Sequence, residues 1–177
     1  MSQGATLYSI TPEEFLRIEK ANGKKIKPLE YGKEYVRFQG SFMALEYLVS
    51  KGKAPREVSL IEEIFNPKKT LGQQNTKGIN FSNLSEDDKE ELYDFIYYLP
   101  PEKTAKISDI LSSVGEDDVS NNYNAEELNT NGIYPEQWQD DDDKTCSRKE
   151  VVTDFNELKR FFSKAAAGPN YILCYVG

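Results

Sequence analysis

Histidine is absent from this chain of 177 residues, and cysteine occurs only twice. Without histidine the chain cannot build Ser-His-Asp or Cys-His nucleophilic sites, and it lacks the commonest protein ligand of zinc, copper and non-haem iron. Two cysteines are too few for a zinc ribbon or a four-cysteine iron–sulfur cluster. We therefore expect no catalytic residues of these classes, no metal site and no cofactor.

Long apolar runs are also missing. No stretch approaches the roughly 18 to 20 apolar residues that cross a bilayer, and the start Met-Ser-Gln-Gly-Ala lacks the basic and apolar parts of a secretion signal. Cys146 lies in a polar segment and Cys174 in an apolar run, which favours free thiols over a secreted disulfide framework. We expect a cytoplasmic protein that does not contact the membrane.

Acidic residues, by contrast, are plentiful. Asp and Glu number 30 against 22 Lys and Arg, which gives a net charge of -8. Such a field repels phosphate backbones, so we expect no nucleic acid, and it favours a basic protein, or a cation, as the partner. Carboxylate pairs can hold Mg²⁺ or Ca²⁺ or hydrolyse glycosides, but spacing singles out no pair. Glu46 beside an apolar helix stripe could be a general acid or base, although a glutamate in such a position more often simply marks the edge of the buried face.

Local patterns predict a helix-rich α+β fold, with residues 1–177 as one domain and a small sheet that uses the N-terminal and C-terminal strands. Residues 5–10 read as a strand, followed by a helix with Thr11 as N-cap, Pro12 at its first position and Glu14 completing a capping box. Apolar periodicity predicts further strands at 34–38 and 171–176, and helices at 42–50 (capped by Ser41), 57–65, 86–99, 102–114 and 148–167. Residues 24–33, 68–80 and 115–131 are predicted loops, the last with one helical turn at 125–128.

The segment from Gly132 to Trp138 stands out because it holds the only tryptophan, Tyr134 and a proline between them. It precedes Asp140, Asp141, Asp142 and Asp143, which lack the alternation and central glycine of a calcium loop. One interpretation makes Tyr134, Trp138 and these four aspartates an interaction surface. The other makes Tyr134 and Trp138 structural anchors that pin an irregular segment to the core, and the aspartates a solvated charge run.

Several of these pieces occur in an order that resembles the YfbM-like family of small bacterial proteins. The pieces are Thr-Pro-Glu-Glu-Phe at 11–15, the helix at 41–52, residues 84–99, Ile133-Tyr134-Pro135 with Trp138, and residues 158–176. The resemblance spans nearly the whole chain and implies an α+β fold and a bacterial cytoplasmic setting, with no catalytic residues to carry over. This chain departs from the family pattern at Phe42, where a tryptophan is expected, and at 68–81, which lacks a glycine-rich tract.

Two function classes follow. The first is a non-enzymatic binding or regulatory protein, such as an immunity protein that neutralises a basic partner, because aromatics beside an acidic run suit a binding hot spot with steering charges. The second is a small enzyme or ligand-binding domain that uses carboxylates and tyrosines in a cleft near Tyr134 and Trp138. Whether the protein catalyses anything stays open, and a monomer is the simpler expectation.

Overall fold

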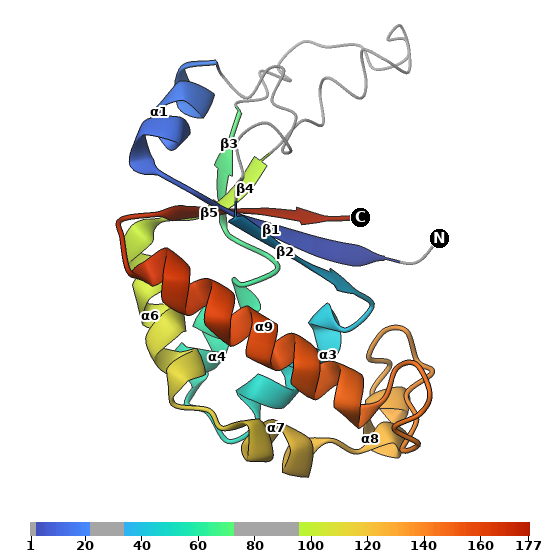
Figure 1. Cartoon of the computed structure of the whole chain (residues 1–177). Coiled ribbons are helices and arrows are strands. Elements are labelled where there is room, and N and C mark those ends of the chain that lie inside the picture. The colour runs from blue at the N-terminus through green and yellow to red at the C-terminus, as the bar shows by residue number, and fades with distance from the viewer. Residues whose placement is uncertain (1–2, 22–33, 73–95) are drawn as a thin grey trace, which may run out of the picture.

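Five strands form one antiparallel sheet in the computed structural model, which describes residues 3–21, 34–72 and 96–177 (Figure 1). The sheet order is β2-β1-β5-β4-β3. The strands are β1 (Gly4–Ile10), β2 (Glu34–Gln39), β3 (Lys69–Leu71), β4 (Ile96–Leu99) and β5 (Tyr171–Val176). The two terminal strands lie side by side in register, with Leu7 opposite Cys174. This confirms the predicted sheet and the α+β class.

Helices cover both faces of this sheet. Helix α1 (Pro12–Lys20) lies on one side, and the other helices lie on the opposite side with α9 running across them (Figure 1). These are α3 (Phe42–Ser50), α4 (Pro55–Glu62), α6 (Pro101–Ser112), α7 (Glu116–Asn122), α8 (Ala125–Thr130) and α9 (Arg148–Ala166). Among the described residues, no helix has the length and apolarity needed to cross a membrane.

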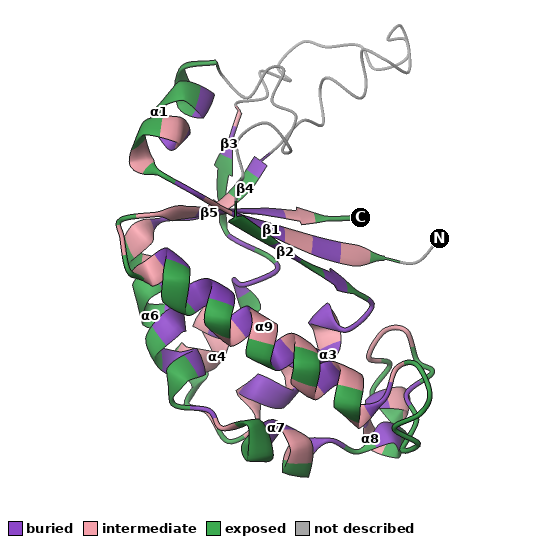
Figure 2. Cartoon of the chain, in the orientation of Figure 1, coloured by how far each residue is buried: buried purple, intermediate pink, exposed green. Residues whose placement is uncertain are grey.

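The two faces of the sheet bury two separate apolar clusters. The larger one joins the sheet to the main helical layer, and Phe38, Phe155 and Phe162 are fully buried within it. The smaller one lies under α1 and contains Phe15 and Ile18. Buried residues accordingly follow the inner faces of the helices, and exposed ones face outward (Figure 2). Alternation along the strands sends successive side chains to opposite clusters.

The start of α1 confirms its predicted cap. The Thr11 side chain accepts a hydrogen bond from the Glu14 backbone, and the Glu14 carboxylate accepts one from the Thr11 backbone N–H at 2.8 Å. Two of the four N–H groups left without helical partners at a helix start are satisfied in this way. The cap fixes the point at which the chain leaves β1 and places Phe15 over the sheet.

One predicted helix is wrong at its C-terminal end. Residues 96–99, read as the last turn of a helix over 86–99, form strand β4 and pair with β5. Buried positions three apart, Ile96 and Leu99, fit a helix stripe and a short strand equally, and cross-strand pairing decides between them. The rest of that predicted helix, the predicted loop at 24–33 and residues 73–80 lie outside the described residues.

Two predicted loops contain regular structure. Residues 115–131 form α7 and α8, where one helical turn was expected. Val119, Tyr123, Ala125 and Leu128 are buried in this segment, and its other positions are exposed or half-buried. Asn124 caps α8 through its side chain. Residues 69–71, expected in a loop, form the edge strand β3 beside β4.

The remaining elements match their predictions to within two or three residues, namely β2, α1, α3, α6, α9 and β5. Helix α4 begins at Pro55 and ends at Glu62, earlier than predicted, so Ile64 and Phe65 are buried from the turn that follows it. Ser41 precedes α3 as predicted, but its hydroxyl donates to the Asp154 carboxylate of α9 and does not cap the helix.

Candidate functional site

The segment from Gly115 to Asp143 holds ten acidic and no basic side chains. This segment, the acidic end of the molecule, comprises α7, α8 and the chain that follows them. Helices α7 and α8 lie at the bottom of the helical layer, on the side away from the sheet (Figure 1). Within the described ranges only Glu127 of these ten makes an ion pair, with Lys51 at 2.8 Å. The other nine charges are therefore not neutralised by ion pairs there.

Trp138 anchors the acidic end to the core. Its side chain is 4% exposed and packs edge-on against Tyr123, with ring centroids 6.4 Å apart. The indole N–H donates to the Ile133 carbonyl at 2.8 Å. The Asn129 side chain accepts from the Trp138 N–H at 2.9 Å and donates to its carbonyl at 3.0 Å. Trp138 therefore contributes almost nothing to the molecular surface, and its polar groups are used within the chain.

Tyr134 is half-buried and ties the same segment to the sheet. Its hydroxyl accepts a hydrogen bond from the Gln3 backbone N–H at 2.9 Å, next to the start of β1. Its ring lies against Gly40, where an added Cβ would be 3.7 Å from a ring carbon. Of the two predicted aromatic residues, Tyr134 thus retains some exposure, while its hydroxyl already has a structural role.

The loop from Gln139 to Ser147 is closed at its base. The Gln139 N–H donates to the Cys146 carbonyl at 3.0 Å, and the Tyr123 hydroxyl donates toward the carbonyls of the same two residues, at 2.7 and 3.1 Å. Burial, with the Asp140 charge adding to it, raises the pKa of Tyr123 to about 12. Tyr123 therefore stays protonated and remains a hydrogen-bond donor at neutral pH.

All four predicted aspartates are exposed on this loop. Asp141 accepts from the Asp143 N–H at 3.0 Å, and Asp142 accepts from the Lys149 N–H at 3.2 Å. The carboxylates of Asp140 and Asp143 have no hydrogen bond or ion pair with any described residue. The structure thus brings the four aspartates together at the surface, two of them shaping the loop and two free to meet a partner.

A second polar feature lies between α3 and α4. It is a cavity of about 240 Å³ whose lining consists of Met43, Glu46, Tyr47, Ser50, Val58, Glu62 and Ile133. Burial and, less strongly, the charge of Glu62 raise the pKa of Glu46 to about 7. Glu46 was a sequence candidate for acid–base chemistry, but Glu62 was not. The cavity reaches Ile133 of the aromatic segment, whereas Tyr134 and Trp138 do not line it.

Sequence reasoning also missed two buried polar pairs, because their members are far apart in the chain. Glu63 is 4% exposed and forms an ion pair with Lys103 of α6. Ser41 is 1% exposed and its hydroxyl donates to the Asp154 carboxylate. Burial raises the pKa of Asp154 above its ordinary value, and the hydrogen bond from Ser41 offsets only part of that rise. The first pair joins the end of α4 to α6, and the second joins the start of α3 to α9. Among the described residues no three cysteine, aspartate or glutamate side chains gather as a metal site.

Known proteins resemble this chain in sequence and in fold. The family described as a domain of unknown function (DUF1877) matches residues 1–175. The crystal structure of YfbM, a protein of unknown function from Escherichia coli, is similar with a TM-score of 0.63 and 11% identity, over 98% of this chain and 99% of that one. That identity shows a shared fold alone. The comparison with curated proteins gives no match. The chain therefore belongs to the DUF1877 family and has a YfbM-like fold, as its sequence motifs indicated.

Proposed function

We propose that the protein is a non-enzymatic binding protein whose acidic end docks a basic protein partner, as an immunity protein docks a toxin. The observation that carries this proposal is the charge of residues 115–143, which hold ten acids and no base. The exposed run from Asp140 to Asp143 is its densest part. A field of one sign steers an oppositely charged partner and can raise association rates by about 10- to 1,000-fold.

The loop that presents these aspartates is fixed at its base by hydrogen bonds within the chain. Trp138 and Tyr123 fix its base through five hydrogen bonds to the chain around them. A loop already held in one conformation loses less conformational freedom when a partner binds, which favours affinity. The anchoring role of Trp138 and the binding role of the aspartates are therefore compatible.

The experiment is affinity capture from the source organism with three immobilised proteins. These are the wild type, the loop variant Asp140→Asn with Asp143→Asn, and a control variant, Glu13→Gln with Glu19→Gln on α1. Both variants remove two negative charges from exposed positions, and the control also removes the exposed ion pair of Glu13 with Arg17. We expect one basic protein enriched on the wild type and the control and depleted at least 5-fold on the loop variant. Equal depletion on both variants would contradict the proposal.

A second candidate function is supported by the cavity at Glu46. Its volume of about 240 Å³ is below the range of about 300 to 1,000 Å³ typical of drug-sized ligands. Apolar walls with two carboxylates suit a small organic amine, which would bind when Glu46 is ionised. A thermal-shift screen of small primary amines at pH 8 tests this, with Glu46→Gln as the matched variant. A stabilisation that the variant loses would support the candidate; no stabilisation by any amine would remove it.

A further inference from the structure

On the outer edge of β2, alternate backbone groups have no partner among the residues that the structure describes. The Gly40 N–H donates to the Gln3 carbonyl at 3.1 Å, so Gln3 and Gly40 are a hydrogen-bonded pair of the ladder. Every second pair from there is also hydrogen-bonded, which includes Leu7 with Val36. Bonded and non-bonded pairs alternate in an antiparallel ladder. The N–H and C=O groups of Tyr35, Arg37 and Gln39 therefore point away from β1.

The hydrogen bonds between β1 and β5 confirm which residues of β1 bond to β2. Gly4 and Gly177 exchange two backbone hydrogen bonds, at 2.9 and 3.0 Å, so the even-numbered residues of β1 bond to β5 and the odd-numbered ones to β2. In the described part of the chain, no hydrogen bond reaches the outward groups of Tyr35, Arg37 or Gln39. No described strand pairs with this edge of the sheet.

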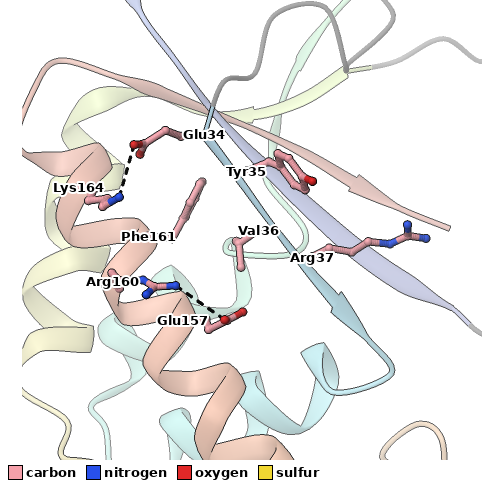
Figure 3. A pocket seen from close by; sticks show the side chains of 8 residues that line it. All are labelled: Glu34, Tyr35, Val36, Arg37, Glu157, Arg160, Phe161 and Lys164. Carbon is pink, nitrogen blue, oxygen red and sulfur yellow. Dashed lines mark hydrogen bonds and ion pairs between the residues drawn. The ribbon is translucent and has the colours of Figure 1, made fainter.

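A groove runs beside this edge, between β2 and α9 (Figure 3). Its volume is about 440 Å³, which is enough for a few side chains. Val36 and Phe161 point into the space between the strand and the helix and form an apolar floor, while Tyr35 and Arg37 project from the other face of β2 (Figure 3). Tyr35 is 60% exposed.

The charges around the groove differ from those of the whole molecule. Lys164 lies 3.5 Å from Glu34, and Arg160 lies 3.7 Å from Glu157, both as exposed pairs. Arg37 is exposed and has no ion pair with any described residue. Three basic and two acidic residues line the groove, on a protein whose net charge is -8. The two ion pairs balance on the α9 side, which leaves the charge of Arg37, on the other face of β2, without an ion pair among the described residues. This local excess of positive charge favours an acidic ligand.

We propose that β2 binds an extended peptide segment of another protein as a sixth strand, and that this segment alternates acidic and apolar residues. Strand addition uses main-chain hydrogen bonds for affinity and side-chain pockets for specificity. An acidic residue of the segment lies across from Arg37 on the same face of the sheet, as opposite charges pair across strands. The apolar residues on either side of it point to the opposite face and fill the groove over Val36 and Phe161.

A second copy of this chain fits the edge less well. The only carboxylate on β2 is that of Glu34, which faces α9 and not the face that carries Arg37 (Figure 3). A β2 strand from another copy would therefore offer Arg37 no carboxylate. Two molecules of charge -8 also repel each other at long range. The proposed segment binds at the β2 edge and not at the acidic end, so the inference is independent of the proposed function.

Selection from a displayed library of random ten-residue peptides tests the proposal, with the wild-type protein as the only bait; binding of the selected peptides to Arg37→Glu is measured afterwards. We expect selected peptides to alternate acidic and apolar residues and to bind Arg37→Glu at least 10-fold more weakly than wild type. The control is Arg17→Glu on α1, an exposed arginine, which should change binding by less than 2-fold.

Amide hydrogen exchange on the wild-type complex gives the second readout. The Tyr35 and Arg37 amides should exchange at least 5-fold more slowly when a selected peptide is bound. Methylation of alternate peptide nitrogens, which removes the donors of a strand ladder, should abolish that protection. Peptides without acidic residues, equal binding to Arg37→Glu, or protection that spares the β2 amides would overturn the proposal. Edge protection that grows with protein concentration in the absence of peptide would overturn it in favour of self-pairing.

Discussion

Trp138 satisfies its indole N–H, backbone N–H and backbone carbonyl inside the chain. Its ring is buried, so Trp138→Ala removes apolar contacts and leaves a cavity. We expect a loss of about 3 to 5 kcal/mol in the free energy of unfolding, measured by urea denaturation. Tyr35→Ala, at an exposed position, should cost less than about 1 kcal/mol. A Trp138→Ala variant that keeps its stability but loses partner binding would give the tryptophan a direct binding role.

Glu46 gives the fold a pH dependence. Its pKa is about 7 in the folded protein against an ordinary value of 4.5, so the folded state holds the proton more tightly. The stability from this group is present at low pH and decreases as pH rises from about 4.5 to 7. Glu46→Gln removes that decrease and should gain about 1 kcal/mol at pH 8, a value reduced for partial solvent exposure.

Unfolding free energies of the wild type and Glu46→Gln between pH 5 and pH 8 check this. The difference between the two proteins should grow with pH and then level off above pH 7. Glu62→Gln should lower the pKa of Glu46, since the Glu62 charge contributes to raising it. Parallel pH profiles for the wild type and Glu46→Gln would show that Glu46 titrates normally.

The cap of α1 acts at the scale of an element. Thr11 and Glu14 satisfy each other's backbone N–H groups, and α1 covers the smaller apolar cluster through Phe15 and Ile18. Thr11→Ala should lower the unfolding free energy by about 1 kcal/mol, whereas Thr11→Ser, which keeps the hydroxyl, should change it by only a few tenths. Equal losses in thermal unfolding of the two variants would mean that the threonine methyl group, and not the cap, is what stabilises α1.

Elements with local signals could be predicted from the sequence, and elements defined by their neighbours could not. Helix α9 has a continuous apolar stripe through Phe155 and Phe162, and β5 is a continuous apolar run. Strand β4 is only four residues long, and its pairing with β5 is not visible in its own sequence. Helix α7 buries a single residue, Val119, so periodicity could not reveal it.

At the scale of the molecule, the family and fold class were predictable because motif order spans the whole chain. The aspartates at 140–143 are adjacent in sequence, so their grouping was also predictable. The partnership of Glu46 with Glu62, the buried ion pair of Glu63 with Lys103 and the open edge at Arg37 depend on how distant segments pack. Each of these needed the tertiary structure.

The net charge of -8 is distributed unevenly, with the acidic end at one place and a local positive charge, that of Arg37, at the β2 edge. A protein with two such surfaces can hold a basic partner and an acidic extended segment at separate positions. The two proposals can therefore fail separately, because Asp140 and Asp143 belong to one surface and Arg37 to the other.

The most direct test of the acidic end is the association rate of the captured partner, measured by stopped flow against ionic strength. We expect the logarithm of the wild-type rate to fall steeply with salt, because exposed charges are screened beyond about 10 Å at 0.1 M salt. At low salt Asp140→Asn with Asp143→Asn should associate at least 5-fold more slowly than wild type, and Glu13→Gln with Glu19→Gln less than 2-fold. A salt-independent rate, or equal slowing by the two variants, would contradict a partner steered by the acidic end.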